Sequence, residues 1–139
     1  MIRIILLFLA FGFFFSSLCA QDEIKQVLNL EYVSYEDSLI LAKEQNKKVF
    51  VFFTGEYCSW CQKQKDVLME QEVLNSLKDH VICFVDLLER KDLAKKYNVK
   101  MVPAYFIIDG EEKLIKKHTG FKTSKDLISW IEYKGWFGR

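Results

Sequence analysis

The chain has 139 residues, of which 50% are hydrophobic, 15% aromatic and 28% charged, and its formal net charge is +1. This composition excludes an intrinsically disordered chain and predicts one globular domain with a sizeable core. Lysines are scattered among acidic residues rather than clustered, so a nucleic-acid partner finds no support in the charge pattern.

The first twenty residues have the profile of a signal peptide. Arg3 supplies a positive start, residues 4–15 form an apolar run broken only by Gly12, and residues 16–20 offer small side chains to a peptidase. We expect cleavage after Ala20, export to the periplasm, and a single domain over residues 21–139. An uncleaved membrane anchor is the alternative, because residues 2–18 approach the roughly 20 residues that a spanning helix needs.

The exported part is expected to begin with residues 22–30, as a short helix or a loose lead-in. Ser34, followed three residues later by Asp37, then predicts a helix start, and this helix reaches about Gln45. The continuous apolar run at residues 49–53 is typical of a strand buried on both faces, so we expect a central strand there.

The rest of the chain predicts alternating helices and strands, with parallel crossovers first and an antiparallel hairpin last. Asp109-Gly110 is the turn signal of the hairpin. After the central strand we expect a helix from Ser59 that continues irregularly to Leu77, a strand over 81–85, a short helix over 90–97, strands over 104–108 and 113–118, and a helix from Ser124 to about Lys134.

Cys58 and Cys61 stand two residues apart at the predicted strand-to-helix junction. Removal of residues 1–20 would leave only these two and Cys83, too few cysteines for a small domain held together by disulfides. A helix N-terminus lowers the pKa of a thiol from about 8.5 to roughly 3.5–7.5 in such motifs. We therefore predict Cys58 as the nucleophile and Cys61 as the resolving thiol of a dithiol–disulfide exchange.

A metal site is the alternative use of these cysteines. With His80 and Cys83 they spell C-x2-C-x18-H-x2-C, a spacing that zinc modules also use. In a strand over 81–85, however, His80 and Cys83 would point to opposite faces, so we expect no metal. Haem attachment through C-x-x-C-H is excluded because Gln62 follows the second cysteine.

Five motifs in this order resemble the thioredoxin superfamily over about Lys48 to Trp130. They are "VFVFF" at 49–53, "CSWC" at 58–61, "VD" at 85–86, "VKMVPAYFIIDG" at 99–110 and "TGF" at 119–121. The resemblance implies an α/β thioredoxin fold, with a central mixed sheet of about four strands flanked by helices. It also implies a redox-active Cys58–Cys61 disulfide, a cis Pro103 whose loop lies against the cysteines, and a Val102 backbone to which an extended substrate segment pairs.

Two departures from the thioredoxin pattern stand at the predicted site. Phe52 occupies the position of a buried aspartate that is thought to manage the proton of the second cysteine, and Ser59-Trp60 replaces Gly-Pro. The chain is more similar to exported thioredoxin-like reductases. That implies reduction of disulfides in secreted client proteins, electrons from a membrane donor, no cofactor beyond the dithiol, and a monomer.

Other conspicuous side chains receive simpler interpretations. Tyr57 and Trp60, beside the cysteines, are expected to form a client-docking patch. Cys83 is interpreted as an inert core thiol. His80 and His118 are interpreted as solvated. A non-catalytic adaptor, whose cysteine pair is a structural disulfide, is the alternative to an enzyme.

Overall fold

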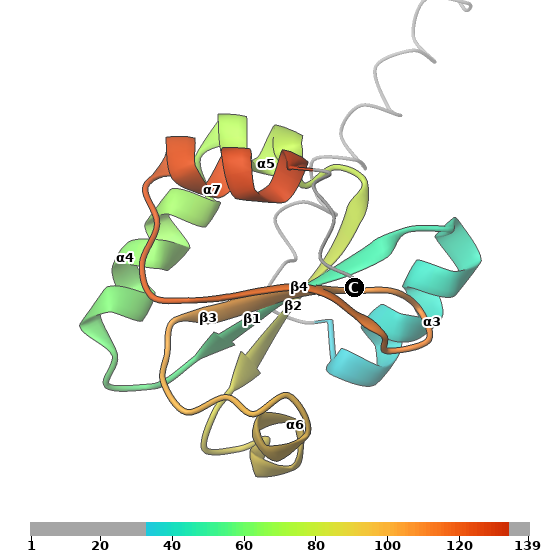
Figure 1. Ribbon diagram of the computed structural model, residues 1–139, viewed down its shortest axis with the longest axis horizontal. Coiled ribbons are helices and arrows are strands. Elements are labelled where there is room, and N and C mark those ends of the chain that lie inside the picture. Colours follow the sequence, from blue (N-terminus) through green and yellow to red (C-terminus); the bar gives the residue numbers. More distant parts are fainter. Residues whose placement is uncertain (1–32, 134–139) are drawn as a thin grey trace, which may run out of the picture. The chain divides into compact units, whose positions relative to one another are not determined.

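The computed structural model describes residues 33–133, which form a four-stranded sheet with helices on both faces (Figure 1). The predicted signal peptide and the lead-in at 22–30 lie outside the described residues. Between residues 33 and 133, no helix is long and apolar enough to cross a membrane. The elements are α3 (Tyr35–Gln45), β1 (Lys48–Thr54), α4 (Ser59–Leu68), α5 (Gln71–Ser76), β2 (His80–Asp86), α6 (Lys91–Lys96), β3 (Ala104–Ile108), β4 (Leu114–Thr119) and α7 (Ser124–Glu132).

Helices α3 and α7 begin where the sequence offers a capping hydroxyl. The Ser34 hydroxyl accepts a hydrogen bond from the Asp37 backbone N–H (3.0 Å), and the Thr123 hydroxyl caps α7 in the same way. The predicted irregular continuation after Ser59 is a pair of helices, since α4 ends at Leu68 and α5 begins at Gln71. Sequence and structure thus agree on every element within residues 33–133, to within a few residues at the ends.

The strand order is β2-β1-β3-β4, with β1 parallel to β2 and antiparallel to β3, and β3 antiparallel to β4. The prediction of parallel crossovers is therefore right for β1–β2 and wrong for the connection that carries α6. That connection begins and ends at the edge of the sheet where β2 ends, because β2 runs parallel to β1 and β3 runs antiparallel to it.

The central strand β1 is buried on both faces, as its apolar run predicts. Each residue from Val49 to Phe53 is 0% exposed. Val49, Val51 and Phe53 join the core beneath α3 and α6. On the other face, covered by α4, α5 and α7 (Figure 1), the Phe50 ring packs against Trp130 of α7 at 6.5 Å between centroids. The segment that follows the end of β1 is therefore attached to a strand that is packed on both faces.

Candidate redox site

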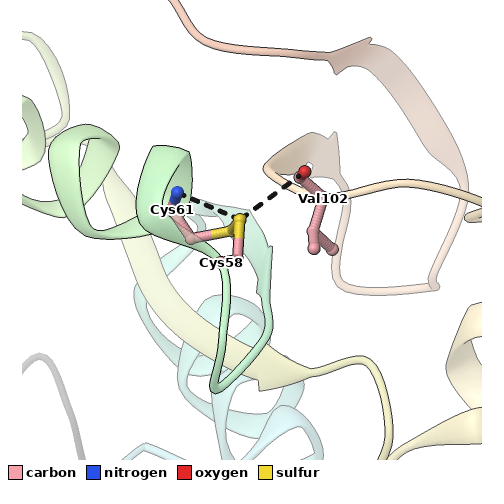
Figure 2. Close-up of a disulfide and its surroundings, with 3 residues drawn as sticks. All are labelled: Cys58, Cys61 and Val102. Carbon is pink, nitrogen blue, oxygen red and sulfur yellow. Dashed lines mark hydrogen bonds between the residues drawn. A yellow bond between two sulfur atoms is a disulfide. The ribbon is translucent and has the colours of Figure 1, made fainter.

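The two cysteines of the "CSWC" motif are joined in a disulfide at the start of α4 (Figure 2). Cys58 is the N-cap residue of α4, four residues beyond the end of β1, and its N–H donates to the Gly55 carbonyl (3.2 Å). Cys61 lies one turn further along, with 5.1 Å between the two Cα atoms. The site therefore stands at the predicted strand-to-helix junction.

The two sulfur atoms differ in their access to solvent. Cys61 is 0% exposed, whereas Cys58 is only partly buried. An incoming sulfur can therefore reach Cys58, while Cys61 can react only with its neighbour. This asymmetry is the arrangement that a nucleophilic Cys58 and a resolving Cys61 require, and the two roles stay a prediction.

The start of α4 also supplies a hydrogen-bond donor to the exposed sulfur. The Cys61 backbone N–H donates to Cys58 Sγ at 3.1 Å. The first N–H groups of a helix have no intrahelical partner, and the helix dipole adds partial positive charge at the same end. A thiolate at Cys58 would be stabilised by both effects. On the same helix, the Lys63 Nζ lies 4.4 Å from the centre of the Trp60 ring, three residues earlier in the chain.

The loop before β3 lies against the disulfide from the other side. The Val102–Pro103 peptide bond is cis, and Pro103 is buried. The Val102 carbonyl oxygen is 3.7 Å from Cys58 Sγ (Figure 2). In the disulfide this sulfur carries no proton, so the pair is a contact, and only a Cys58 thiol could donate to the carbonyl. The pairing of β3 with β1 ends at Ala104, which leaves Val102 beyond the ladder.

Large apolar side chains are exposed on the elements that surround the disulfide. Tyr57 is 89% exposed, Trp60 54% and Met101 67%. The Trp60 ring packs against Phe121, with 5.4 Å between centroids. Sequence reasoning identified Tyr57 and Trp60 as candidates but not Met101 or Phe121. The pairing of Ala104 with Thr119 brings "TGF" beside the Pro103 loop. Phe121 could have been predicted near the disulfide only if this strand pairing had been known.

The residue in the place of the family's buried aspartate is part of an aromatic cluster. Phe52 is 0% exposed, and its ring lies 5.4 Å from Phe84 and 6.5 Å from Tyr105. Two residues on, the Thr54 hydroxyl is buried and has no hydrogen-bond partner within the described part of the chain. Strand β1 contains no acidic residue, so no carboxylate in this strand takes the place of the aspartate.

Three further side chains test the simpler interpretations. Burial raises the pKa of the Cys83 thiol to about 12, in keeping with an inert core thiol. The interpretation of the histidines as solvated is wrong. His80 has a buried Nδ1, and desolvation lowers its pKa to about 4. His118 is partly buried at 5.3 Å from the Tyr105 ring, and desolvation lowers its pKa.

The four residues of the zinc-like spacing do not come together. His80 pairs with Lys48 at the start of β1, whereas Cys58 follows the end of that strand. A seven-residue strand separates such positions by roughly 20 Å. Over residues 33–133, no group of three or more histidine, cysteine or acidic side chains is arranged to hold a metal ion.

Comparison with known proteins places these features in a family. A family model described as a thioredoxin-like domain matches residues 35–135. A thioredoxin H-type protein of Brassica campestris is 32% identical over 82 residues, covering 59% of this chain and 65% of that protein. The disulfide bond reductase DsbH of Chlamydia pneumoniae is 24% identical over 103 residues, covering 64% of this chain and 62% of that protein. The chain thus spans less than two thirds of the length of these relatives.

Comparison of structures supports the same fold. A thioredoxin from Thermus thermophilus has a TM-score of 0.66 at 22% identity, covering 73% of this chain and 83% of that chain. At this level of identity the likeness establishes the fold alone. The predicted α/β thioredoxin fold, with its mixed sheet flanked by helices, is confirmed.

Proposed function

The chain belongs to the thioredoxin-like family, and from this premise we propose that it is an exported thiol:disulfide oxidoreductase that reduces disulfides of client proteins. The observation that carries the proposal is the geometry of Cys58. Cys58 is only partly buried, and its sulfur caps a helix and accepts the Cys61 N–H, while Cys61 is fully buried. A purely structural disulfide needs neither the accessibility nor the donor.

The reaction begins from the reduced dithiol. The Cys58 thiolate attacks one sulfur of a client disulfide, the client S–S bond breaks, and one client thiolate leaves. Cys61 then passes its proton to the client thiolate released in the first step, and its own thiolate attacks Cys58 Sγ. The mixed disulfide breaks, the second client thiolate leaves, and the Cys58–Cys61 disulfide that the structure contains is formed. Two electrons have passed to the client, and a dithiol donor must return them by the reverse exchange.

Client binding is assigned to the surface around Cys58. Tyr57 and Trp60 offer exposed apolar area to a client side chain. Val102, beyond the end of the β1–β3 ladder, offers free backbone groups to an extended client segment beside the cis Pro103. These four residues, with the two cysteines, form the proposed site.

Export and the electron donor belong to the same proposal. The profile of residues 1–20 supports secretion into the periplasm, where disulfides form and a reductant needs a constant supply of electrons. A membrane dithiol protein is the proposed donor. N-terminal sequencing of the periplasmic fraction tests the expected start at Gln21, and retention in the membrane fraction would indicate the uncleaved anchor instead.

The test of the proposed activity is turnover of insulin disulfides with a dithiol donor. We expect Cys58→Ser to abolish turnover and Cys61→Ser to accumulate a mixed disulfide with the client, because the resolving thiol is gone. We expect an equilibrium potential against glutathione near roughly −270 mV rather than about −120 mV, the value of a strong oxidant. An adaptor with a structural disulfide would show no turnover and no trapped mixed disulfide.

A further inference from the structure

A fully buried glutamine lies on the redox helix, one turn beyond the resolving cysteine. Gln64 is 0% exposed, like Cys61 three residues earlier, so both side chains occupy the buried face of α4. Glutamine is seldom fully buried, and its amide is costly to bury unless both of its ends are hydrogen-bonded. The partners of this amide therefore indicate what the side chain does.

Both ends of the Gln64 amide bind one residue of the loop between β4 and α7. The Lys122 backbone N–H donates to Gln64 Oε1 at 2.8 Å, and Gln64 Nε2 donates to the Lys122 carbonyl at 3.3 Å. These two bonds span 58 residues of sequence and join the redox helix to residues 120–123. We refer to residues 120–123 as the β4–α7 loop.

The other end of the β4–α7 loop is fixed to the second half of the site. The Gly120 N–H donates to the Pro103 carbonyl at 2.8 Å, and the Tyr105 hydroxyl donates to the Gly120 carbonyl at 3.2 Å. Gly120 has φ +102°, a backbone conformation that favours glycine. The loop thus connects the segment that contains Pro103 with the helix that contains the cysteines.

Phe121 lies between these two attachment points and faces the redox motif. Its ring is 5.4 Å from that of Trp60, the residue between the two cysteines, and Lys63 lies over the same indole. Phe121 is 37% exposed and Trp60 54%, so the pair presents an apolar wall to solvent beside the disulfide.

We propose that Gln64 is a positioning residue for client recognition: it holds the β4–α7 loop to α4 and so fixes Phe121 against Trp60. The inference rests on the proposed function and deepens it. The wall that Gln64 maintains favours client disulfides that are flanked by an apolar or aromatic side chain. Small disulfides that contact only Cys58 make no use of it.

The test compares a protein disulfide with a small one in Gln64→Leu. For insulin we expect KM to rise roughly two- to tenfold, the effect of one lost aromatic contact, with kcat nearly unchanged. For 2-hydroxyethyl disulfide we expect an unchanged rate. Phe121→Ala should give the same rise in KM, and the double variant should show no further rise, because both changes remove one wall.

Controls separate positioning from mere loss of stability. Ser38→Ala removes another fully buried hydrogen bond, from the hydroxyl to the Tyr35 carbonyl (2.6 Å), on the opposite face of the sheet. It should lower stability without changing KM. The nuclear Overhauser effect between Trp60 and Phe121 should weaken in Gln64→Leu and persist in Ser38→Ala.

Several outcomes would overturn the inference. These are an unchanged KM in Gln64→Leu, additive effects in the double variant, or an equal loss of rate with both substrates. Should Gln64→Leu fail to fold, an unchanged KM for insulin in Phe121→Ala would refute the proposal that Phe121 contributes to client recognition. If the wild-type protein reduces neither disulfide, the proposed function fails instead, and the Overhauser comparison still decides whether Gln64 positions Phe121.

Discussion

The stabilisation of a Cys58 thiolate by the Cys61 backbone N–H can be tested by a pair of substitutions. Cys61→Ala removes the second sulfur, prevents the disulfide and keeps the N–H. Cys61→Pro also prevents the disulfide but removes the donor. Residue 61 is the third residue of α4, within the first turn, where proline is tolerated. The substitution also removes the bond from this N–H to the Cys58 carbonyl (3.1 Å).

The magnitude follows from the bond of the Cys61 N–H to Cys58 Sγ, because the bond of the same N–H to the Cys58 carbonyl involves no group that titrates. A hydrogen bond to a charged group contributes about 1.5–3 kcal/mol, and one pKa unit corresponds to about 1.4 kcal/mol. The Cys58 thiol of Cys61→Pro should therefore have a pKa about one to two units above that of Cys61→Ala. In Cys61→Ala we expect the pKa of the Cys58 thiol to lie below the ordinary value of about 8.5, because the N–H donor stabilises the thiolate.

The assay is the rate of alkylation by iodoacetamide between pH 5 and pH 10, with circular dichroism to verify the fold. Cys83 gives no background in the folded protein, because it is buried and its pKa is raised to about 12. Equal pKa values in the two variants would refute a role for this N–H. A value near 8.5 in Cys61→Ala would contradict thiolate activation altogether and favour the adaptor.

Three further predictions concern buried groups around the site and at the far end of the sheet. Thr54→Val should raise the free energy of unfolding by about 1 kcal/mol, because it removes a buried hydroxyl that has no hydrogen-bond partner within residues 33–133. Urea denaturation measures this change, and a lower free energy of unfolding would show that the hydroxyl does have a partner. Phe52→Asp should lower the free energy of unfolding by about 3–5 kcal/mol, because the core loses a ring and gains a buried carboxyl group. Phe52→Leu should lower it by about 1 kcal/mol. Since folding lowers the pKa of His80 to about 4, the unfolded chain takes up its proton first. Stability should therefore fall by about 2 kcal/mol between about pH 6.5 and pH 4, allowing for partial exposure of the ring, and His80→Gln should flatten this dependence.

Local signals in the sequence were sufficient for the elements and for the centre of the site. Ser34 with Asp37 gives the start of α3, and the unbroken apolar run at 49–53 gives the double-sided burial of β1. Cys58 and Cys61 are recognised by their spacing at a junction between two such elements. Each of these features depends on residues within one turn of a helix or one strand, which is why a single sequence reveals them.

Features that depend on contacts across the fold were not predictable in the same way. Gln64 reads as one of many polar residues on an amphipathic helix, and only its contact with Lys122 explains why it is fully buried. His80 reads as a polar residue in a turn, yet desolvation by the surrounding fold keeps it neutral near pH 5. The burial of a polar side chain is decided by its distant neighbours, and those neighbours are set by the pairing of strands.

The antiparallel pairing of β1 with β3 explains why three loops meet at the disulfide. Because the strands run in opposite directions, the end of β1 and the start of β3 lie at one edge of the sheet, which places Cys58 beside Val102 and Pro103. The pairing of β3 with β4 then brings the end of β4 to the same edge, through Ala104 and Thr119. A parallel β3, as the sequence alone suggested, would have moved the proline loop to the opposite edge, roughly 20 Å from the cysteines. The positions of the proposed nucleophile, of the proposed client-binding backbone and of the apolar wall are therefore consequences of one reversal in strand direction.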